Sequence, residues 1–384
     1  MNQRWCVLNA PSFFVYTFQL ANMNHLKKYL LVFLVCASLN TPSMAAEFTV
    51  NLANEWFIHN PSLPILALDN GLYGKFKIDK FSTEFIQNSI NISYKRISVS
   101  YSKQFASFLH FSKDTAELAY VLSKKQNLET TRVYDIALDY QFYSFKASRL
   151  SALVLQTQTT SVELGASYLQ GESLINGQLS GGIRALSTSD LQFENLLVDY
   201  YYSSDQIFTR SVVAPNGTGK AFDFDWMWHI DRLTTFHLSG RNIFSSIIWK
   251  QSPHTRAMLR SDNKTYDENG YVDIQPGLSG RHDYVDYEQV LPAQFFARFD
   301  FRGQAAKPVF MQWHYINQIA YPSIGIEYFS NHRLSMEAQF DIKSRALGLL
   351  VDTKYVDLYV ASDHINPKHS RFFVLRFILS ILNY

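Results

Sequence analysis

The sequence predicts an all-β fold: a single transmembrane antiparallel β-barrel of about 14–18 strands, preceded by a cleaved N-terminal signal peptide. Three observations lead to this prediction. The composition is aromatic and poor in charge, the N-terminal segment has the layout of a secretory leader, and apolar and polar residues alternate along many later segments.

The composition separates this chain from soluble enzymes and from helical membrane proteins. Of its 384 residues, 47% are hydrophobic, 15% are aromatic and only 18% are charged. So little charge is unusual for a soluble enzyme, yet the mean hydropathy of −0.12 is too polar for a bundle of membrane helices. A membrane barrel reconciles these facts, because its strands carry lipid-facing apolar and lumen-facing polar residues in equal number.

Residues 1–45 are expected to be a signal peptide that is removed after Ala45. Its parts are a basic pair (Lys27, Lys28), an apolar run (29–38) and small residues at positions −3 and −1 (Ser43, Ala45). The apolar run is shorter than the roughly 20 residues with which a helix spans a bilayer. Residues 1–22 precede the basic pair, so Met23 is an alternative start to Met1.

Removal of this leader limits the chemistry of the mature chain. Cys6 and Cys36 both lie in it, so the mature chain has no disulfide and no thiolate metal site. Val35 precedes Cys36 where a lipoprotein signal needs a small residue. Loss of three basic residues and no acidic ones changes the formal net charge from +2 to −1. This near-neutral balance argues against a nucleic-acid partner.

Strict period-two alternation is clearest in residues 221–231. One face has Phe222, Phe224, Trp226, Trp228 and Ile230, and the other has Asp223, Asp225, Met227, His229 and Asp231. Segments 132–142, 295–302 and 334–343 follow the same rule. Successive strand side chains point to opposite faces, so we expect an aromatic outer face and a polar face that lines the bore.

This pattern supplies two sets of candidate residues. The candidates for the lumen lining are Asp135, Asp139, Asp223, Asp225, His229, Asp231, Arg298, Asp300, Arg302, Glu337, Asp341 and Lys343. The candidates for membrane-interface aromatics are Trp226, Trp228, Tyr134, Tyr140 and Phe340. A soluble β-sandwich also alternates. Aromatic-rich faces and strands of about ten residues, long enough to cross a bilayer at a tilt, favour the barrel.

The connections indicate how the chain is organised. The apolar phase switches across Lys95-Arg96, which predicts a tight hairpin, and Asn331-His332 separates two other alternating runs. Residues 46–70 alternate poorly and are expected to form an N-terminal periplasmic segment or a plug, followed by the barrel over 71–384. The polar stretch 251–291 is expected to be a long loop, on the surface or folded inward.

At this point the chain resembles Gram-negative outer-membrane barrels as a class, through its leader, its cysteine-free mature region, its alternating strands and its final aromatic residue, Tyr384. The resemblance implies the cell outer membrane as location. It implies outer-membrane lipid and lipopolysaccharide as surroundings, and recognition of the C-terminal strand by the barrel insertion machinery. The short element Asn60-Pro61-Ser62-Leu63 is similar to one in long-chain fatty-acid transporter barrels.

Other chemistry is poorly supported, and we expect no enzyme, cofactor or metal site. Asp225 or Asp231 with His229 could activate water, but such residues are ordinary in a polar lumen. Oxygen-rich residues 262–270 lack the ligand order of a calcium loop. Residues 217–220 lack the first glycine and the hydroxyl residue of a phosphate loop.

The favoured function is therefore a pore or facilitated channel for small solutes, with lumen charges that tune selectivity. Two alternatives stay open: a barrel that transports a hydrophobic ligand, and a structural or assembly barrel of a secretion or surface system. A barrel enzyme is the least favoured alternative.

Overall fold

The structure is a computed structural model that describes residues 48–67, 76–77, 79–124, 132–187, 190–261, 264–266, 272–274, 277–303, 307–331 and 333–381. The expected signal peptide and Tyr384 lie outside these residues. The strands are β1 (Phe48–His59), β2 (Phe81–Tyr94), β3 (Ile97–Phe111), β4 (Val133–Gln156), β5 (Thr160–Ser187), β6 (Asp190–Tyr202), β7 (Asn216–His229), β8 (Thr234–Leu259), β9 (Lys264–Tyr266), β10 (Val272–Ile274), β11 (Leu278–Val290), β12 (Gln294–Phe301), β13 (Val309–Ile316), β14 (Ile319–Ser330), β15 (Leu334–Asp341), β16 (Ala346–Thr353), β17 (Val356–Ser362) and β18 (Phe372–Ile381). The helices are the 3-10 turn η1 (Ile65–Ala67) and α4 (Lys113–Ser123). Within the described residues, no helix is long and apolar enough to cross a membrane.

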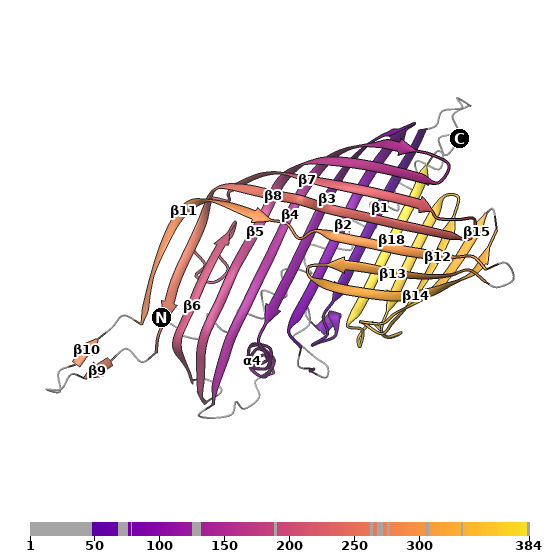
Figure 1. Cartoon of the computed structure of the whole chain (residues 1–384). Helices are drawn as coiled ribbons and strands as arrows, with labels where there is room; N and C mark the ends of the chain where they lie inside the picture. The colour runs from indigo at the N-terminus through magenta and orange to yellow at the C-terminus, as the bar shows by residue number, and fades with distance from the viewer. Residues whose placement is uncertain are drawn as a thin grey trace.

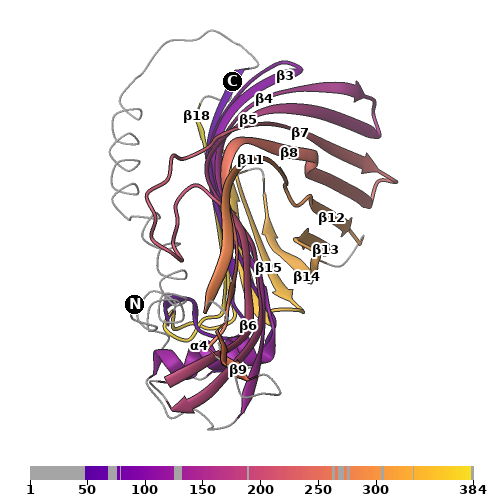
Figure 2. The ribbon, with the colours of Figure 1, turned by 90° about the vertical axis from the view of Figure 1, so that its left-hand side faces the viewer.

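Fourteen strand positions close into one antiparallel barrel. β1 pairs with β2 on one side and with β18 on the other, so the first and last strands of the chain meet. β6 and β7 together fill one position between β5 and β8, and β11 and β12 together fill the next position along β8. Figure 2 shows the sheet curving from β3 and β4 through β7 and β8 to β12, β13 and β14. The predicted all-β barrel is confirmed.

The two ends of the barrel differ in their connections. β1 begins and β18 finishes at the end that we call the turn end, where the predicted hairpin at Lys95-Arg96 is confirmed by the pairing of Tyr94 with Ile97. The opposite end, which we call the loop end, has longer connections, including 60–80, 112–132 and 260–277. This alternation of short turns and long loops is typical of outer-membrane barrels.

Five strands continue past the rim at the loop end and form what we call the extension. It consists of β6 and the loop-end parts of β4, β5, β8 and β11. In Figure 1 these long strands run well past β12, β13 and β14. By contrast, β13, β15 and β16 have eight residues each. Eight residues tilted by about 40° span roughly 20 Å, close to the apolar band of a membrane barrel.

The outer face of the barrel carries a belt of exposed apolar side chains. Its members include Ile90, Ile92, Val99, Tyr101, Leu150, Leu164, Phe222, Met311, Trp313, Ile324, Phe340, Leu347, Leu349 and Val360. They are in register across strands: Ile92 pairs with Val99, which pairs with Leu150. A closed barrel has no further sheet to cover such a belt, so lipid covers it. The protein is therefore a transmembrane barrel of the outer-membrane type.

The aromatic outer face continues into the extension, where protein replaces lipid as its cover. Tyr134 and Tyr140 lie on the same face of β4 as Leu150, but they are only 1% and 5% exposed. Leu118 and Leu122 of α4 pack in the same cluster, and residues of the segment 203–215 pack against it. The expectation that Tyr134 and Tyr140 lie at the membrane interface is therefore wrong, because their part of β4 lies beyond the rim.

The first turn of α4 also covers the free edge of β4. Ser112 caps the helix by accepting the backbone N–H of Thr115 and donates its hydroxyl to the carbonyl of Asp135. The N–H groups of Asp135 and Ala137 donate to Asp114 Oδ2 and Thr115 Oγ1, each over 3.0 Å. Side chains thus satisfy strand groups that no neighbouring strand reaches, which protects the edge from pairing with another chain.

Two expectations about connections are wrong. Residues 48–59 belong to the barrel wall as β1, so they are neither a periplasmic segment nor a plug. Strand structure occupies most of 251–291, because β8 runs to Leu259 and β11 begins at Leu278. This hairpin lies in the extension, where water rather than lipid surrounds the sheet. Polar residues suit both faces there, so the segment lacks the apolar face of a membrane strand.

Candidate functional site: the bore

The half of the bore nearest the turn end is mainly polar, and a cavity of about 230 Å³ lies between it and the apolar side chains Phe57, Tyr321 and Phe372. Glu55, Asp225, His237, Arg241, Gln312 and Arg376 are among its lining residues, and they come from β1, β7, β8, β13 and β18. Arg241 Nη1 donates to Glu55 Oε2 over 3.1 Å, which joins β8 to β1 across the bore. Charges here therefore face one another rather than an open channel.

Nearly every base in this half is matched by carboxylates. Arg298 donates to Asp300 and forms a bidentate pair with Glu337, at distances of 2.7–2.9 Å. Arg376 lies 3.3 Å from Asp357. Bidentate pairs of this kind are among the stronger charge interactions in proteins. They fix side chains in place and leave little unpaired charge to select ions.

β7 presents its acidic face to the bore, as the alternation predicts. Asp225 lies 2.7 Å from His237 Nε2, and Asp223 lies 3.0 Å from Arg149 Nε. His229, at the end of the same strand, contacts Thr235 at 3.1 Å. The structure therefore brings Asp225 together with a histidine other than His229.

The half nearest the loop end is filled by packed apolar side chains, which we call the bore core. It contains Phe57, Phe85, Ala106, Phe108, Tyr143, Phe145, Ala147, Leu169, Leu174, Ala221, Ile247, Trp249, Leu291, Ile316, Tyr321, Ala346, Ala361, Phe372 and Val374. Phe57 of β1 has ring contacts with Tyr321 of β14 at 4.9 Å and Phe372 of β18 at 5.5 Å. Aromatic rings from facing walls thus meet in the middle of the barrel.

Trp249 is the largest fully buried side chain of the bore core. Its indole nitrogen donates to Gln289 Oε1 over 3.0 Å. Gly171 and Gly217 leave the space that the ring occupies, since a Cβ at either position would lie 2.4 or 2.7 Å from the indole. Glycine is therefore required at both positions because two strands approach one aromatic ring.

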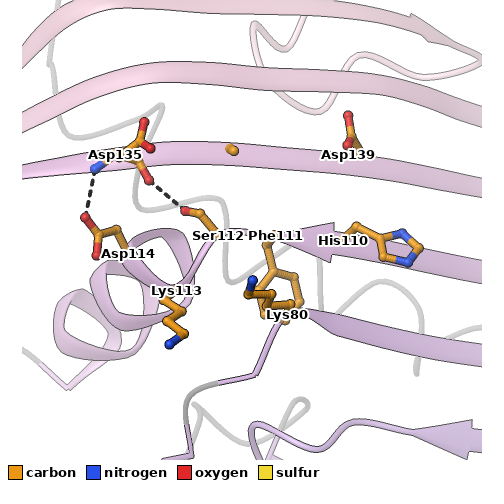
Figure 3. Close-up of a pocket in the computed structure, with 9 residues that line it drawn as sticks. Lys80, His110, Phe111, Ser112, Lys113, Asp114, Asp135 and Asp139 are labelled. Carbon is orange, nitrogen blue, oxygen red and sulfur yellow. Dashed lines mark hydrogen bonds between the residues drawn. The ribbon is translucent and has the colours of Figure 1, made fainter.

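Above the bore core, at the loop end, lies a polar vestibule of about 510 Å³. It is lined mainly by Phe108, His110, Asp139, Gln141, Asn176, Gln178, Asp199, Tyr201, Tyr287, Asn317 and Gln318. A second hollow of about 580 Å³ shares His110 and Asp139 with it. Figure 3 shows that this hollow extends from His110 and Asp139 along β3 and β4 to Ser112 and Asp114 at the start of α4.

His254 is held firmly at the side of the vestibule. Its Nε2 lies 2.8 Å from Asp199 and its Nδ1 lies 3.0 Å from Asp283. The ring stacks on Tyr201, which in turn stacks on Tyr287. This clamp therefore joins β6, β8 and β11 across the extension.

The predicted lumen residues divide into three groups by position. Those in the turn half are Asp223, Asp225, Arg298, Asp300 and Glu337, with Asp341 at the edge of the same cavity and His229 at the strand end. Asp135 and Asp139 lie beyond the bore core in the hollows of the extension. Three lie in connections: Asp231, Arg302 and Lys343.

For those three, the expectation of a place on the lumen wall is wrong. Asp231 accepts the N–H groups of Leu233 and Thr234 and so shapes the β7–β8 turn. Arg302 follows the last residue of β12 and is exposed. Lys343 lies in the β15–β16 turn with its ammonium 5.7 Å from the ring of Phe81. These three residues continue the alternating pattern of β7, β12 and β15, but they lie just beyond the ends of those strands. The pattern alone does not indicate where a strand ends.

The predicted interface aromatics also divide. Trp226 and Trp228 stack on each other with centroids 6.0 Å apart on the outer face near the turn end, and Phe340 is 38% exposed on the outer face of β15. Tyr134 and Tyr140 are buried, as described above. The bore core and the His254 clamp were missed altogether, although the pair Tyr143 and Phe145 on the polar-facing side of β4 was a visible signal.

No family model matches the chain, and no curated protein matches it. Solved structures with a similar fold include a deletion mutant of the TodX monoaromatic hydrocarbon channel, with a TM-score of 0.44, 9% identity and coverage of 88% of this chain and 90% of that one. The P. putida toluene transporter TodX has a TM-score of 0.40 and 10% identity, with coverage of 88% of this chain and 90% of that one. The Ralstonia pickettii toluene transporter TbuX has a TM-score of 0.27 and 8% identity, with coverage of 88% of this chain and 89% of that one. Each of these TM-scores is below 0.5.

Proposed function

We propose that the protein is an outer-membrane channel that facilitates the passage of small hydrophobic solutes. The observation that supports this most directly is the bore core, where aromatic and aliphatic side chains from several strands fill the bore of the described barrel. A small apolar solute exchanges one apolar environment for another there, whereas an ion or sugar loses its water without gaining hydrogen bonds.

The polar compartments on either side fit the same proposal. The vestibule offers amides, carboxylates and tyrosines at the loop end, and the turn half offers paired charges around a small cavity. Neither compartment presents a row of unpaired charges of one sign, which an ion-selective pore requires. We infer that the core sets the selectivity and that the compartments supply entry and exit.

We further propose a transport role rather than a catalytic one. The enzyme alternative placed His229 with Asp225 or Asp231, but His229 contacts Thr235 and Asp231 accepts backbone N–H groups of its own turn. A histidine that acts as general base is commonly oriented by a carboxylate, and among the described residues no carboxylate lies within ion-pair distance of His229. We also keep the proposal that the insertion machinery recognises β18, whose outer face (Phe373, Leu375, Phe377, Leu379, Ile381) is apolar.

The test is solute uptake by intact cells whose outer leaflet is lipopolysaccharide, with and without the protein. We expect faster uptake of a radiolabelled monoaromatic hydrocarbon and unchanged uptake of a monosaccharide of similar size. The variant Phe372→Asn places an amide in the core and should abolish the gain. Phe340→Asn, on the outer face, is the matched control and should keep it.

Two results would contradict the proposal. One is faster sugar uptake without any gain for the hydrocarbon, and the other is a large, stable ionic conductance of the purified protein in planar bilayers. Heat-modifiable migration on gels verifies that each variant is a folded barrel. This control distinguishes a loss of transport from a loss of folding.

A further inference from the structure

Basic residues are concentrated in the connections at the turn end. Five of these connections hold seven of them: Lys95, Arg96, Arg232, Arg302, Lys307, Arg333 and Lys354. We call these seven residues the basic rim. Asp231 is the one acidic residue in the same connections. At the loop end, by contrast, bases are mixed with acids, as where Arg132 pairs with Asp114 and Glu117.

No carboxylate neutralises the basic rim. Within the described part of the chain, none of the seven residues has an acidic partner within ion-pair distance, and all seven are exposed. The carboxylate of Asp231 is occupied by backbone N–H groups. Several carboxylates inside the bore near this end have their own bases, since Arg298 holds Asp300 and Glu337 and Arg376 holds Asp357. Among the described residues, Glu327 and Asp352 also lie near this end, and neither is within ion-pair distance of a rim residue. Positive charge on the rim therefore has to find its counter-charge outside the protein.

Three lysines of the rim lie over exposed tyrosine rings. The ammonium groups of Lys95, Lys307 and Lys354 are 5.3, 3.9 and 5.2 Å from the ring centroids of Tyr94, Tyr328 and Tyr355. These rings are 52%, 67% and 53% exposed. Exposed tyrosines next to an apolar belt lie at the level of lipid headgroups. The three contacts therefore hold the lysine charges at that level too.

We propose that the basic rim binds the phosphates of anionic phospholipids in the leaflet that surrounds the turn end. Ammonium and guanidinium groups pair readily with phosphate. The seven charges are distributed over five connections around the barrel instead of converging in one hollow. A ring of separate headgroups fits this distribution, and a single soluble polyanion does not. Clusters of basic residues beside a membrane attract anionic lipid through the same forces.

The full-length processed protein, reconstituted in bilayers of phosphatidylethanolamine with a minor fraction of phosphatidylglycerol, tests the proposal. The readout is the ratio of the two lipids that remain bound after mild detergent extraction, measured by native mass spectrometry. We expect a several-fold enrichment of phosphatidylglycerol. The variant K95Q/R96Q/K307Q/K354Q should reduce this ratio to that of the bulk bilayer.

The matched control is K80Q/K113Q/K343Q/K368Q, which removes as many charges at the loop end and should keep the enrichment. Equal ratios in the wild type and the rim variant would overturn the proposal. Displacement of the lipid by inorganic phosphate, but not by chloride of equal ionic strength, would also overturn it and indicate a site for free phosphate. Heat-modifiable migration on gels verifies that each variant is folded. Solute uptake is measured separately, so the proposal for the basic rim and the proposal for the channel can be rejected independently of each other.

Discussion

The two halves of the bore are held together by different forces. In the turn half, Arg241 reaches Glu55 across a small cavity, and Arg298 holds two carboxylates. In the loop half, Trp249 and its aromatic neighbours are packed without exposure to solvent. The same barrel wall, with the same alternation, therefore encloses a wet region and a dry one. A period-two pattern predicts which side chains point inward. Whether that part of the bore is hydrated depends on whether these side chains are polar or apolar.

The comparison predicts that the largest loss of stability comes from the dry half. Replacing Trp249 by alanine removes a fully buried ring and leaves a cavity between Gly171 and Gly217. We expect the free energy of unfolding to fall by about 3–5 kcal/mol, as for other buried aromatics. Urea titration of the barrel in lipid vesicles measures it.

The control for this prediction is Trp313→Ala on the outer face, where the ring is 38% exposed. Its cost should be about 1 kcal/mol, because lipid can fill the space that the ring leaves. Equal losses for both tryptophans would mean that the bore core contributes no more to stability than the lipid-facing belt.

A smaller loss is expected in the wet half. The change Arg298→Met leaves Asp300 and Glu337 next to each other without a base, and should cost about 2–3 kcal/mol. Neutralising the carboxylates as well, in R298M/D300N/E337Q, should restore much of that loss. A triple variant as unstable as the single one would show that shape rather than charge matters here. Urea titration again supplies the values.

The cover of the extension should depend on pH through Asp205, whose side chain is fully buried. Burial raises the pKa of this carboxyl, but hydrogen bonds from Tyr200, Arg210 and the backbone of Phe208 outweigh it, so the pKa lies below its ordinary value. A depressed pKa stabilises the fold above the unfolded pKa of about 4, and the effect is lost as the pH falls through the folded pKa.

The variant Asp205→Asn should therefore cost about 1–2 kcal/mol at neutral pH and much less in acid. The rate of pepsin cleavage within 203–215, compared between the wild type and the variant at each pH, measures this. Protection of the wild type at about pH 5 that decreases as the pH falls below the unfolded pKa of about 4 is the expected result. A constant ratio over that range would contradict it.

The smallest effect is expected at His229, which is exposed at the turn end and contacts only Thr235 among the described side chains. The variant His229→Ala should change the free energy of unfolding by less than about 0.5 kcal/mol. Hydrocarbon uptake should also be unchanged. A loss of uptake without a loss of folding would give this residue a functional role that its contacts do not suggest.

The comparison also explains how far the sequence could predict the structure. β7 was predicted well because each face has one character: Trp226 and Trp228 point to lipid, and Asp223 and Asp225 point to the bore. β1 was missed because Asn54 interrupts its outer face and Phe57 adds an aromatic ring to its inner face, where it joins the dry half. The first half of the strand does alternate, with Val50 and Leu52 on the outer face and Thr49 and Asn51 on the inner one.

The candidate site was harder to predict than the wall. Arg241 and Glu55 lie on opposite sides of the barrel, and Asp199, His254 and Asp283 come from three strands. Each such contact depends on the number of strands and on their register. The sequence predicts the number only as a range of about 14–18, and it does not predict the register. The inward direction of the charged residues could be predicted, but the partner of each charge could not.

The pairing of β1 with β18 has a consequence for biosynthesis. Val50 pairs with Ile381, so the closing seam joins segments that lie 331 residues apart in the chain. Loop closure over such a separation is slow and has a large entropic cost. Until β18 pairs with it, one edge of β1 keeps a row of unsatisfied amides and carbonyls. A chaperone or assembly factor that shields this edge during transit would prevent premature aggregation.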